Sequence, residues 1–261
     1  MNAPLDLIPL IRNACVDKKL REDARIIWRT IAKNLFEEKH RNGIRISDSG
    51  RCILELWSEL HGKLDIEEDP DLQLTRFDIG TLYGARIACL TAAAIEAAHP
   101  DWDCVLEADV AVDGVPGHID ILVRMRDLDL TPLLVIEIKS TYWSGALDDP
   151  YIRAPYQVHQ AVSYAEGKKA PWAVILTVGP AVHGSYSKAL KAFVKPPKMR
   201  QDNYETHVHA PAAHREIARL KAALSPHPPE ADAKEKWRCD SCRFSACERN
   251  KNPLNIMAVE P

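Results

Sequence analysis

The sequence predicts an α/β core with a mixed sheet flanked by helices. Three observations predict it: a long helical pattern at residues 75–98, three short apolar runs at 105–112, 117–123 and 133–139, and a helical pattern at 156–166 followed by an apolar run at 172–178. The order is therefore helix, three meandering strands, helix, strand. This order is typical of a core in which helices cover a mixed sheet.

The composition is that of a folded protein with a substantial core. The chain has 261 residues, of which 46% are hydrophobic and 27% charged, enough for one elaborated domain or one domain with a small appendage. It contains no run of about 18 apolar residues and no secretory signal pattern, so we expect no membrane span and a cytoplasmic location. A formal net charge of −3 argues against coating nucleic acid through overall charge, although a local basic groove can still bind it.

The first part of the chain is predicted to be helical. Residues 5–40 carry apolar positions at helical spacing, which indicates one or two amphipathic helices. Capping residues near Asp48 predict a helix that starts there and carries Cys52 in its first turns. The pattern at 75–98 is rich in Ala, Leu and Ile, with Gly80 and Gly84 as weak interruptions.

The strand region reads as a meander. Residues 105–112 alternate, Asp113-Gly114 is a hairpin signal, and residues 117–123 form the returning strand. A turn at 126–132 leads to the strand 133–139. We divide the chain into an N-terminal helical region (1–74), a core (75–224, with a last helix at 210–224) and a linker with a Cys-rich segment (225–261). The basic stretch 187–200 is either a solvated face or a nucleic-acid contact.

Charged residues lie in two of the apolar runs. Side chains alternate along a strand, so Glu137 and Lys139 share one face while Ile136 and Ile138 share the other. If the preceding strand pairs with this one, Asp120 lies beside Glu137. Two carboxylates then form a site for a hard divalent cation. The alternative is a salt bridge at a strand end.

This set of residues suits phosphodiester hydrolysis. A bound cation lowers the pKa of its water and neutralises charge on the phosphate, while Lys139 orients the nucleophile or stabilises developing charge. The backbone carbonyl of Ile138 is a candidate third metal ligand. Gln160 and Tyr164 lie four apart on the next helix, hence on one face. They are placed to bind a phosphate or the attacking water and to hold Lys139.

These residues resemble the RecB-like nucleases of the PD-(D/E)XK superfamily. The matching stretches, which cover the central half of the chain, are Gly117-His118-Ile119-Asp120, Glu137-Ile138-Lys139-Ser140 and Gln160-Ala161-Val162-Ser163-Tyr164. Within the superfamily, the similarity is greatest to the iron-sulphur CRISPR adaptation nucleases and their phage-encoded exonuclease relatives. The resemblance implies a restriction-endonuclease-like core. It also implies that Asp120 and Glu137 are metal ligands, that Lys139 is the catalytic lysine, and that Gln160 and Tyr164 support them.

The resemblance further implies an activity. We expect a Mn²⁺- or Mg²⁺-dependent DNA exonuclease or end-processing nuclease, acting on DNA that is single-stranded or has single-stranded ends. The implied partners are the CRISPR spacer integrase in antiviral defence, or phage recombination proteins. Tyr142 and Trp143 follow Lys139 directly and are candidates either for stacking on bases or for packing the loop on the core.

The cysteines extend the resemblance. There are seven, an odd number, at positions 15, 52, 89, 104, 239, 242 and 247. Three crowd near the C-terminus, which favours metal or cluster ligation over disulfides. In the family, one early and three late cysteines hold a four-iron four-sulphur (4Fe-4S) cluster, which implies Cys52, Cys239, Cys242 and Cys247 here. Zinc remains an alternative, as in a zinc-stapled restriction-type endonuclease. The other three cysteines are expected to be buried thiols.

The chain departs from the family at one position. Family members carry a His or Glu four residues after a glycine on the helix before the sheet, where this chain has Gly84. Because strand neighbours face opposite sides, we expect neither His118 nor His159 to replace that ligand. A catalytically weak DNA-capture or adaptor module is therefore the alternative to an active nuclease.

Overall fold

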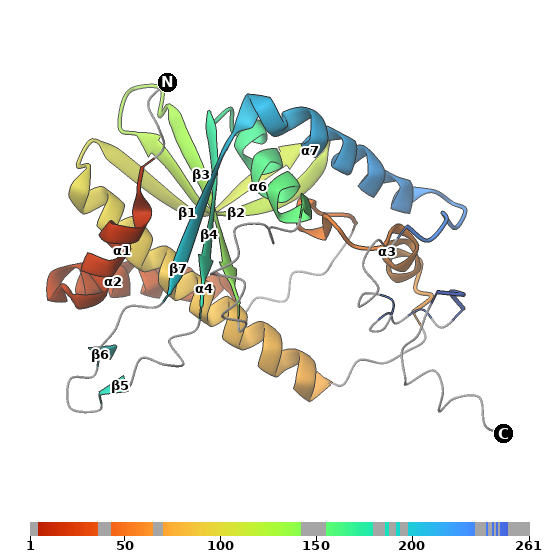
Figure 1. Cartoon of the computed structure of the whole chain (residues 1–261), viewed down its shortest axis with the longest axis horizontal. Coiled ribbons are helices and arrows are strands. Elements are labelled where there is room, and N and C mark those ends of the chain that lie inside the picture. The colour runs from red at the N-terminus through yellow and green to blue at the C-terminus, as the bar shows by residue number, and fades with distance from the viewer. Residues whose placement is uncertain are drawn as a thin grey trace.

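The computed structural model describes most of the chain. The described residues are 5–35, 43–64, 70–141, 155–179, 186–187, 192–193, 198–232, 239, 242, 244 and 246–249. Figure 1 shows a central sheet with α1, α2 and α4 on one face and α6 and α7 on the other.

The elements follow one another in the predicted order. The helices are α1 (Leu7–Val16), α2 (Lys18–Leu35), α3 (Ile53–Leu60), α4 (Pro70–Ala98), α6 (Pro155–Gly167) and α7 (Thr206–Lys221), with short 3-10 helices η1 (Ile46–Asp48) and η2 (Ala222–Leu224). The strands are β1 (Trp102–Val112), β2 (Val115–Met125), β3 (Pro132–Ser140), β4 (Trp172–Val178), β5 (Tyr186–Ser187), β6 (Ala192–Phe193) and β7 (Met199–Glu205).

The main sheet is mixed, as predicted. Its strand order is β1-β2-β3-β4-β7, with β3 and β4 parallel and the other neighbouring pairs antiparallel. Parallel neighbours need a crossover connection, and α6 provides it. The predicted fold class, an α/β core with a mixed sheet flanked by helices, is thus confirmed in its element order and its sheet.

The β1–β2 hairpin confirms the turn prediction. Asp113 and Gly114 both have left-handed backbones, with φ of 50° and 79°. Two consecutive positive φ angles are what a two-residue type I′ hairpin requires. The helix that the sequence places at 210–224 begins earlier, at Thr206, and ends at Lys221.

The segment before α3 differs from the prediction. A helix starting near Asp48 was expected, but only the short 3-10 turn η1 forms there, and α3 begins at Ile53. Gly50 is the physical reason: its φ of 80° interrupts the helix, and its missing Cβ leaves room for the Tyr156 ring. Cys52 consequently lies at the N-cap of α3 instead of in its first turns.

Two apolar cores cover the two faces of the sheet. One core joins the sheet to α3, α6 and α7, and includes Trp57, Tyr164 and Ile217. The other joins it to α1, α2 and α4, and includes Ile11 and Ile95. Within the described residues, none of these helices combines the length and the apolar character needed to cross a bilayer.

Gly117 allows α6 to pack directly on β2. A Cβ at this position would lie 2.5 Å from Cε1 of Tyr164 and 3.2 Å from Cβ of Ile46. We expect Gly117→Ala to lower the free energy of unfolding by about 1–3 kcal/mol, because both neighbours are fully packed. Gly84→Ala is the matched control: a Cβ there meets nothing within 4 Å. It should raise stability by about 0.5–1 kcal/mol, since glycine weakens a helix interior. Urea denaturation of both variants measures the difference, and equal stability would contradict the packing account.

His214 links α7 to α6 and to the β1–β2 turn. Its Nε2 lies 2.7 Å from Glu166 Oε1 and its Nδ1 3.2 Å from Asp113 Oδ2. The hydrogen bond to Glu166 is the main cause that raises the pKa of His214 above its ordinary 6.5. The contacts of protonated His214 therefore stabilise the folded protein fully below about pH 6.5. This stabilisation is lost as the pH rises through the pKa of His214 in the folded state.

A His214→Gln variant is expected to lose this pH dependence. Melting temperatures between about pH 5 and pH 9, which span the ordinary pKa of histidine, should converge with those of the wild type at the alkaline end. His207→Gln, at an exposed histidine, serves as control. Parallel pH curves for the wild type and His214→Gln would contradict the prediction.

Candidate active site

The candidate site lies where β2 and β3 separate. Their pairing runs from Arg124 to Ile121, which is opposite Ile136, and β2 makes no further pair with β3 beyond it. Asp120, the next residue of β2, instead accepts a hydrogen bond on Oδ2 from the backbone N–H of Ile138, at 2.6 Å. The carboxylate of Asp120 thereby occupies the opening between the strands and comes next to Glu137, as the sequence predicts.

Glu137 and Lys139 project together on the α6 side of β3. Lys139 Nζ donates to Glu137 Oε1 at 2.7 Å and to Gln160 Oε1 at 2.9 Å. Ile136 and Ile138 belong to the core on the opposite face, so the predicted alternation is confirmed. The side chain of Glu137 is 5% exposed and that of Lys139 is 26% exposed, so Lys139 is the more accessible side chain of the pair.

Gln160 and Tyr164 complete a connected network. The Gln160 amide nitrogen donates to Glu137 Oε1 and to the Tyr164 hydroxyl, each at 3.0 Å. Both residues are buried on α6, and Tyr164 packs against Gly117. The amide of Gln160 therefore fixes both charged side chains, which is the holding function that the sequence analysis predicted for this helix.

The protonation of the site reflects burial and mutual charge. Asp120 keeps some exposed surface, yet desolvation of its carboxylate raises its pKa well above the ordinary value. The negative charge of Glu137 raises the pKa of Asp120 further, and the hydrogen bond from the Ile138 N–H lowers it. Burial lowers the pKa of Lys139, but the charge and hydrogen bond of Glu137 outweigh that effect and raise it. Burial also raises the pKa of Tyr164. The site therefore has a charged lysine, a neutral phenol, and an Asp120 carboxyl whose pKa stays raised although the Ile138 N–H and the Lys139 charge both lower it.

A divalent cation fits this arrangement. Among the described residues, Glu137 Oε2 is buried and has no hydrogen-bond partner, a costly state for a carboxylate oxygen. An ion held by Glu137 Oε2 and the Asp120 carboxylate would satisfy both groups, and Mn²⁺ or Mg²⁺ takes such oxygen ligands together with waters. In the described part of the chain, no three His, Cys, Asp or Glu side chains gather to hold an ion. The Ile138 carbonyl stays a predicted ligand.

The position that lacks the helix-borne ligand, Gly84, and one candidate replacement, His118, can both be placed. Gly84 lies on α4 and its absent side chain would extend into open space, so neither crowding nor left-handed backbone requires glycine there. His118 lies between Gly117 and Ile119, which both face the core on the α6 side, so strand alternation directs His118 to the other face of the sheet, away from Glu137. Its Nδ1 instead lies 2.7 Å from Oδ1 of Asp109 on β1.

Some of the cysteines predicted to bind a metal or cluster lie close together near α3. Burial raises the pKa of the Cys242 thiol to about 11, and nearby Cys52 and Cys247 contribute to the rise. The carbonyl of Cys239 accepts from the Cys242 N–H at 3.5 Å. Early and late cysteines of the sequence therefore share one region. Of the remaining three, Cys15 and Cys89 are buried as predicted, whereas Cys104 is only half-buried, because it lies near the start of the edge strand β1.

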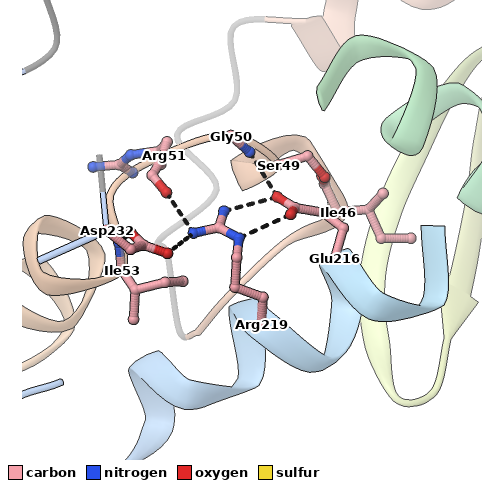
Figure 2. A network of polar contacts seen from close by, with 8 residues as sticks. All are labelled: Ile46, Ser49, Gly50, Arg51, Ile53, Glu216, Arg219 and Asp232. Carbon is pink, nitrogen blue, oxygen red and sulfur yellow. Dashed lines mark hydrogen bonds and ion pairs between the residues drawn. The ribbon is translucent and has the colours of Figure 1, made fainter. Parts of the chain in front are cut away.

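A polar network centred on Arg219 holds the backbone around Cys52 (Figure 2). The guanidinium of Arg219 on α7 makes two hydrogen bonds to Glu216, at 2.7 and 2.8 Å, and also binds Asp232, at 2.6 Å, and the carbonyl of Arg51, at 3.0 Å. Glu216 accepts from the Gly50 N–H at 2.7 Å, and Asp232 accepts from the Ile53 N–H at 2.8 Å. The network therefore fixes both sides of Cys52.

This network could not be predicted from the sequence, because its members are separated by up to 182 positions in the chain, from Gly50 to Asp232. Asp232 lies in a proline-rich linker that also carries Glu230, so its acidic side chain was no distinctive signal. Tyr142, Trp143 and most of the basic stretch 187–200 lie outside the described residues, so their proposed contacts stay predictions.

Comparisons with known proteins add similarities of overall shape. No protein-family model matches the chain, and no curated protein matches it. Among solved structures, the chain is similar to the crystal structure of SSO0001, with 15% identity and a TM-score of 0.49 over 89% of this chain and 96% of that one. It is also similar to an alkaline exonuclease, LHK-Exo, from Laribacter hongkongensis, with 12% identity and a TM-score of 0.38 over 74% and 92%. At this level of similarity, the case for the site rests on its own geometry.

Proposed function

We propose that the chain is a Mn²⁺- or Mg²⁺-dependent deoxyribonuclease of the PD-(D/E)XK type. It is an exonuclease or end-processing enzyme that acts on DNA with single-stranded character. The observation that carries the proposal is the buried, unpartnered Glu137 Oε2 next to the desolvated carboxylate of Asp120, with the Lys139 ammonium on the same face. A salt bridge at a strand end would explain the contact between Lys139 and Glu137 Oε1. It would not explain why the carboxylate of Asp120 lies beside that pair.

Each residue has a defined part in the proposed reaction. Asp120 and Glu137 hold the cation, which when bound supplies an activated water and neutralises charge on the phosphate. Lys139 places a positive charge beside this position and stabilises the negative charge that develops on the phosphate. Gln160 keeps Lys139 aimed along Glu137. Tyr164 stays protonated, so its hydroxyl can accept from Gln160 while donating elsewhere.

The test is cleavage of end-labelled single-stranded DNA with Mn²⁺, with Mg²⁺, and with EDTA. We expect cleavage only with added metal, and we expect Glu137→Gln to abolish it, since the neutral amide keeps the shape of Glu137 but removes the negative charge. Glu166→Gln, on α6 outside the site, is the matched control. Equal cleavage by the wild type and Glu137→Gln would refute the assignment.

A DNA-capture or adaptor module is the second candidate function. It is favoured by Gly84, which leaves the α4 position without a ligand side chain. This candidate predicts metal-independent binding of DNA without turnover, and a fluorescence-anisotropy titration in EDTA combined with the cleavage assay separates the two. Its proposed partners are a CRISPR spacer integrase or phage recombination proteins, and the neighbouring genes distinguish these settings.

For the cysteine site we propose a 4Fe-4S cluster on Cys52, Cys239, Cys242 and Cys247. The proximity of Cys52 and Cys247 to Cys242 supports it, as does the network that fixes the backbone around Cys52. Zinc is the competing ion, because a Cys-x-x-Cys pair also suits it. An anaerobic preparation that is brown, with visible charge-transfer absorption, supports the cluster. A colourless preparation with one zinc per chain contradicts it.

A further inference from the structure

Arg200 ends the basic stretch 187–200, to which the proposed function gives no role. It lies on β7, the edge strand that pairs with β4. Lys198 comes just before this strand and is exposed, and its carbonyl accepts from the N–H of Gly179 at 2.9 Å. Lys198 and Arg200 are the charged residues of the stretch that the structure describes, and they lie at the end of the sheet where β3 and β4 finish.

The register of the sheet places Arg200 in one row with Lys139. Lys139 on β3 pairs with Thr177 on β4, and Thr177 pairs with Arg200 on β7. Neighbouring strands lie about 4.8 Å apart, so the backbones of Lys139 and Arg200 are roughly 10 Å apart. That distance equals about three nucleotides of a stacked DNA strand, at about 3.4 Å each.

The side chain of Arg200 lies on the same face of the sheet as the candidate site. The next residue, Gln201, donates to the carbonyl of Leu5, which packs with the core on the α1 side. Tyr204 packs with the core on the α6 side. Because side chains alternate along a strand, Arg200 shares the α6 side with Tyr204, and therefore with Lys139.

The ion pair of Arg200 repeats the arrangement at Lys139. Lys139 donates to Glu137, two residues away on the same strand, at 2.7 Å. Arg200 Nε and Nη2 donate to Oδ1 of Asp202, also two residues away, at 3.0 and 2.8 Å. Glu137 and Asp202 both pair with Ile175. The two carboxylates thus share one row, and the two cations share the next row toward the end of the sheet.

The guanidinium of Arg200 suits a phosphate at this position. The side chain of Arg200 is 15% exposed, compared with 26% for Lys139. Its hydrogen bonds to Asp202 orient the guanidinium, whose planar fork of N–H donors matches the oxygens of a phosphate. The ion pair does not exclude such a contact, because Lys139 is likewise paired with Glu137 and still faces the phosphate in the proposed reaction.

We propose that Arg200 binds a backbone phosphate of the DNA strand, within about three nucleotides of the phosphate that faces Lys139. The bound strand therefore crosses β4 from β3 toward β7. This rests on the proposed function. Arg200 contacts the substrate away from the bond that is cut and does not hold the cation. A phosphate contact of this kind sets the affinity and the position of the strand, whatever its base sequence.

Fluorescence-anisotropy titration of the full chain with a single-stranded oligothymidylate, without added divalent cation, tests the inference between about 50 and 200 mM salt. Each phosphate contact on single-stranded DNA contributes about 0.7 to the slope of log K against log salt concentration. Arg200→Gln is expected to lower this slope by about 0.7 and to weaken binding about 3- to 5-fold near physiological salt.

Arg124→Gln is the matched control for Arg200→Gln. Arg124 is also an arginine paired with an aspartate, Asp103, but it lies at the opposite end of the sheet, opposite Pro132 at the start of β3. This variant removes the same charge from the protein and should bind the oligonucleotide like the wild type. A loss of affinity that is equal in both variants would show an effect of net charge and would refute the contact.

A double variant and a second ligand separate the contact from folding and from the chemistry. Arg200→Gln with Asp202→Asn removes both charges of the pair, so it tests the contact even if Arg200→Gln is unstable, and it should show the same lower slope. Calorimetric Mn²⁺ binding should be unchanged in both. If both keep the wild-type slope, the role of Arg200 is refuted and cleavage by the wild type still supports the nuclease. If the wild type neither binds the oligonucleotide nor cleaves it with Mn²⁺, the proposed function and this inference both fail.

Discussion

Replacing Lys139 with methionine is expected to lower DNA cleavage by about three orders of magnitude while Mn²⁺ still binds. The ammonium contacts Glu137 Oε1 and Gln160 Oε1. It therefore competes with a cation for Glu137 and is not itself a ligand of that cation. Its removal takes away the charge that faces the phosphate and leaves the carboxylates available to the ion. Methionine keeps the length of the apolar part of lysine.

The readouts are single-turnover cleavage of labelled DNA and calorimetric Mn²⁺ titration on the same preparation. Lys221→Met, at an exposed lysine at the end of α7, is the control and should match the wild type in both. Loss of Mn²⁺ binding together with cleavage would show that Lys139 is needed to build the site. Unchanged cleavage would remove Lys139 from the chemistry.

Arg219→Ala is expected to lower the free energy of unfolding by about 1.5–3 kcal/mol, because several charge-assisted hydrogen bonds of a half-buried network are lost together. Glu216 and Asp232 would each lose their guanidinium partner, and the Arg51 carbonyl would lose a donor. Desolvation raises the pKa of the half-buried Glu216 carboxyl, but the hydrogen bonds from Arg219 and the Gly50 N–H and the charge of Arg219 outweigh it and lower the pKa. Without Arg219, that carboxylate loses its ion-pair partner and keeps the hydrogen bond from the Gly50 N–H.

Arg124→Ala is the matched control for Arg219. Its side chain is 28% exposed, close to the 27% of Arg219, but its ion pair is with Asp103 alone. We expect a loss of less than about 1 kcal/mol. Guanidinium denaturation at fixed pH measures both variants, and similar losses would show that the Arg219 network adds nothing beyond one surface pair. In Arg219→Ala, the metal content of the cysteine site should fall as well, because the backbone on both sides of Cys52 is released.

The residues of the candidate site could be predicted because local spacing determines their placement. Glu137 and Lys139 share a face through strand alternation, and Gln160 and Tyr164 share one through helical spacing. The short turn between β2 and β3 brings Asp120 beside Glu137 without any information from the rest of the chain. The meander and the hairpin at Asp113-Gly114 follow from equally local signals.

Features that depend on distant packing could not be predicted. The strand pattern gives no sign that Glu107 on β1 has a left-handed backbone, with a φ of 52°. The pair before it, Leu106 with Ile121, packs in the core with α4, and the pair after it, Ala108 with Ile119, packs in the core with α6. Cys52 lies at a helix N-cap because Gly50 packs on Tyr156, more than a hundred residues away in the chain. The partners of Arg219 are likewise set by how α7 meets the segment before α3.

In the proposed function, Asp120 and Glu137 form a cation site that serves phosphodiester hydrolysis. Its most direct test is anomalous diffraction from crystals soaked in Mn²⁺. The predicted result is one strong anomalous peak within about 2.0–2.6 Å of a carboxylate oxygen of Asp120 and of Glu137 Oε2, absent from crystals of Glu137→Gln. A peak elsewhere on the chain, or no peak at saturating Mn²⁺ with Glu137 Oε2 still unpartnered, would contradict it.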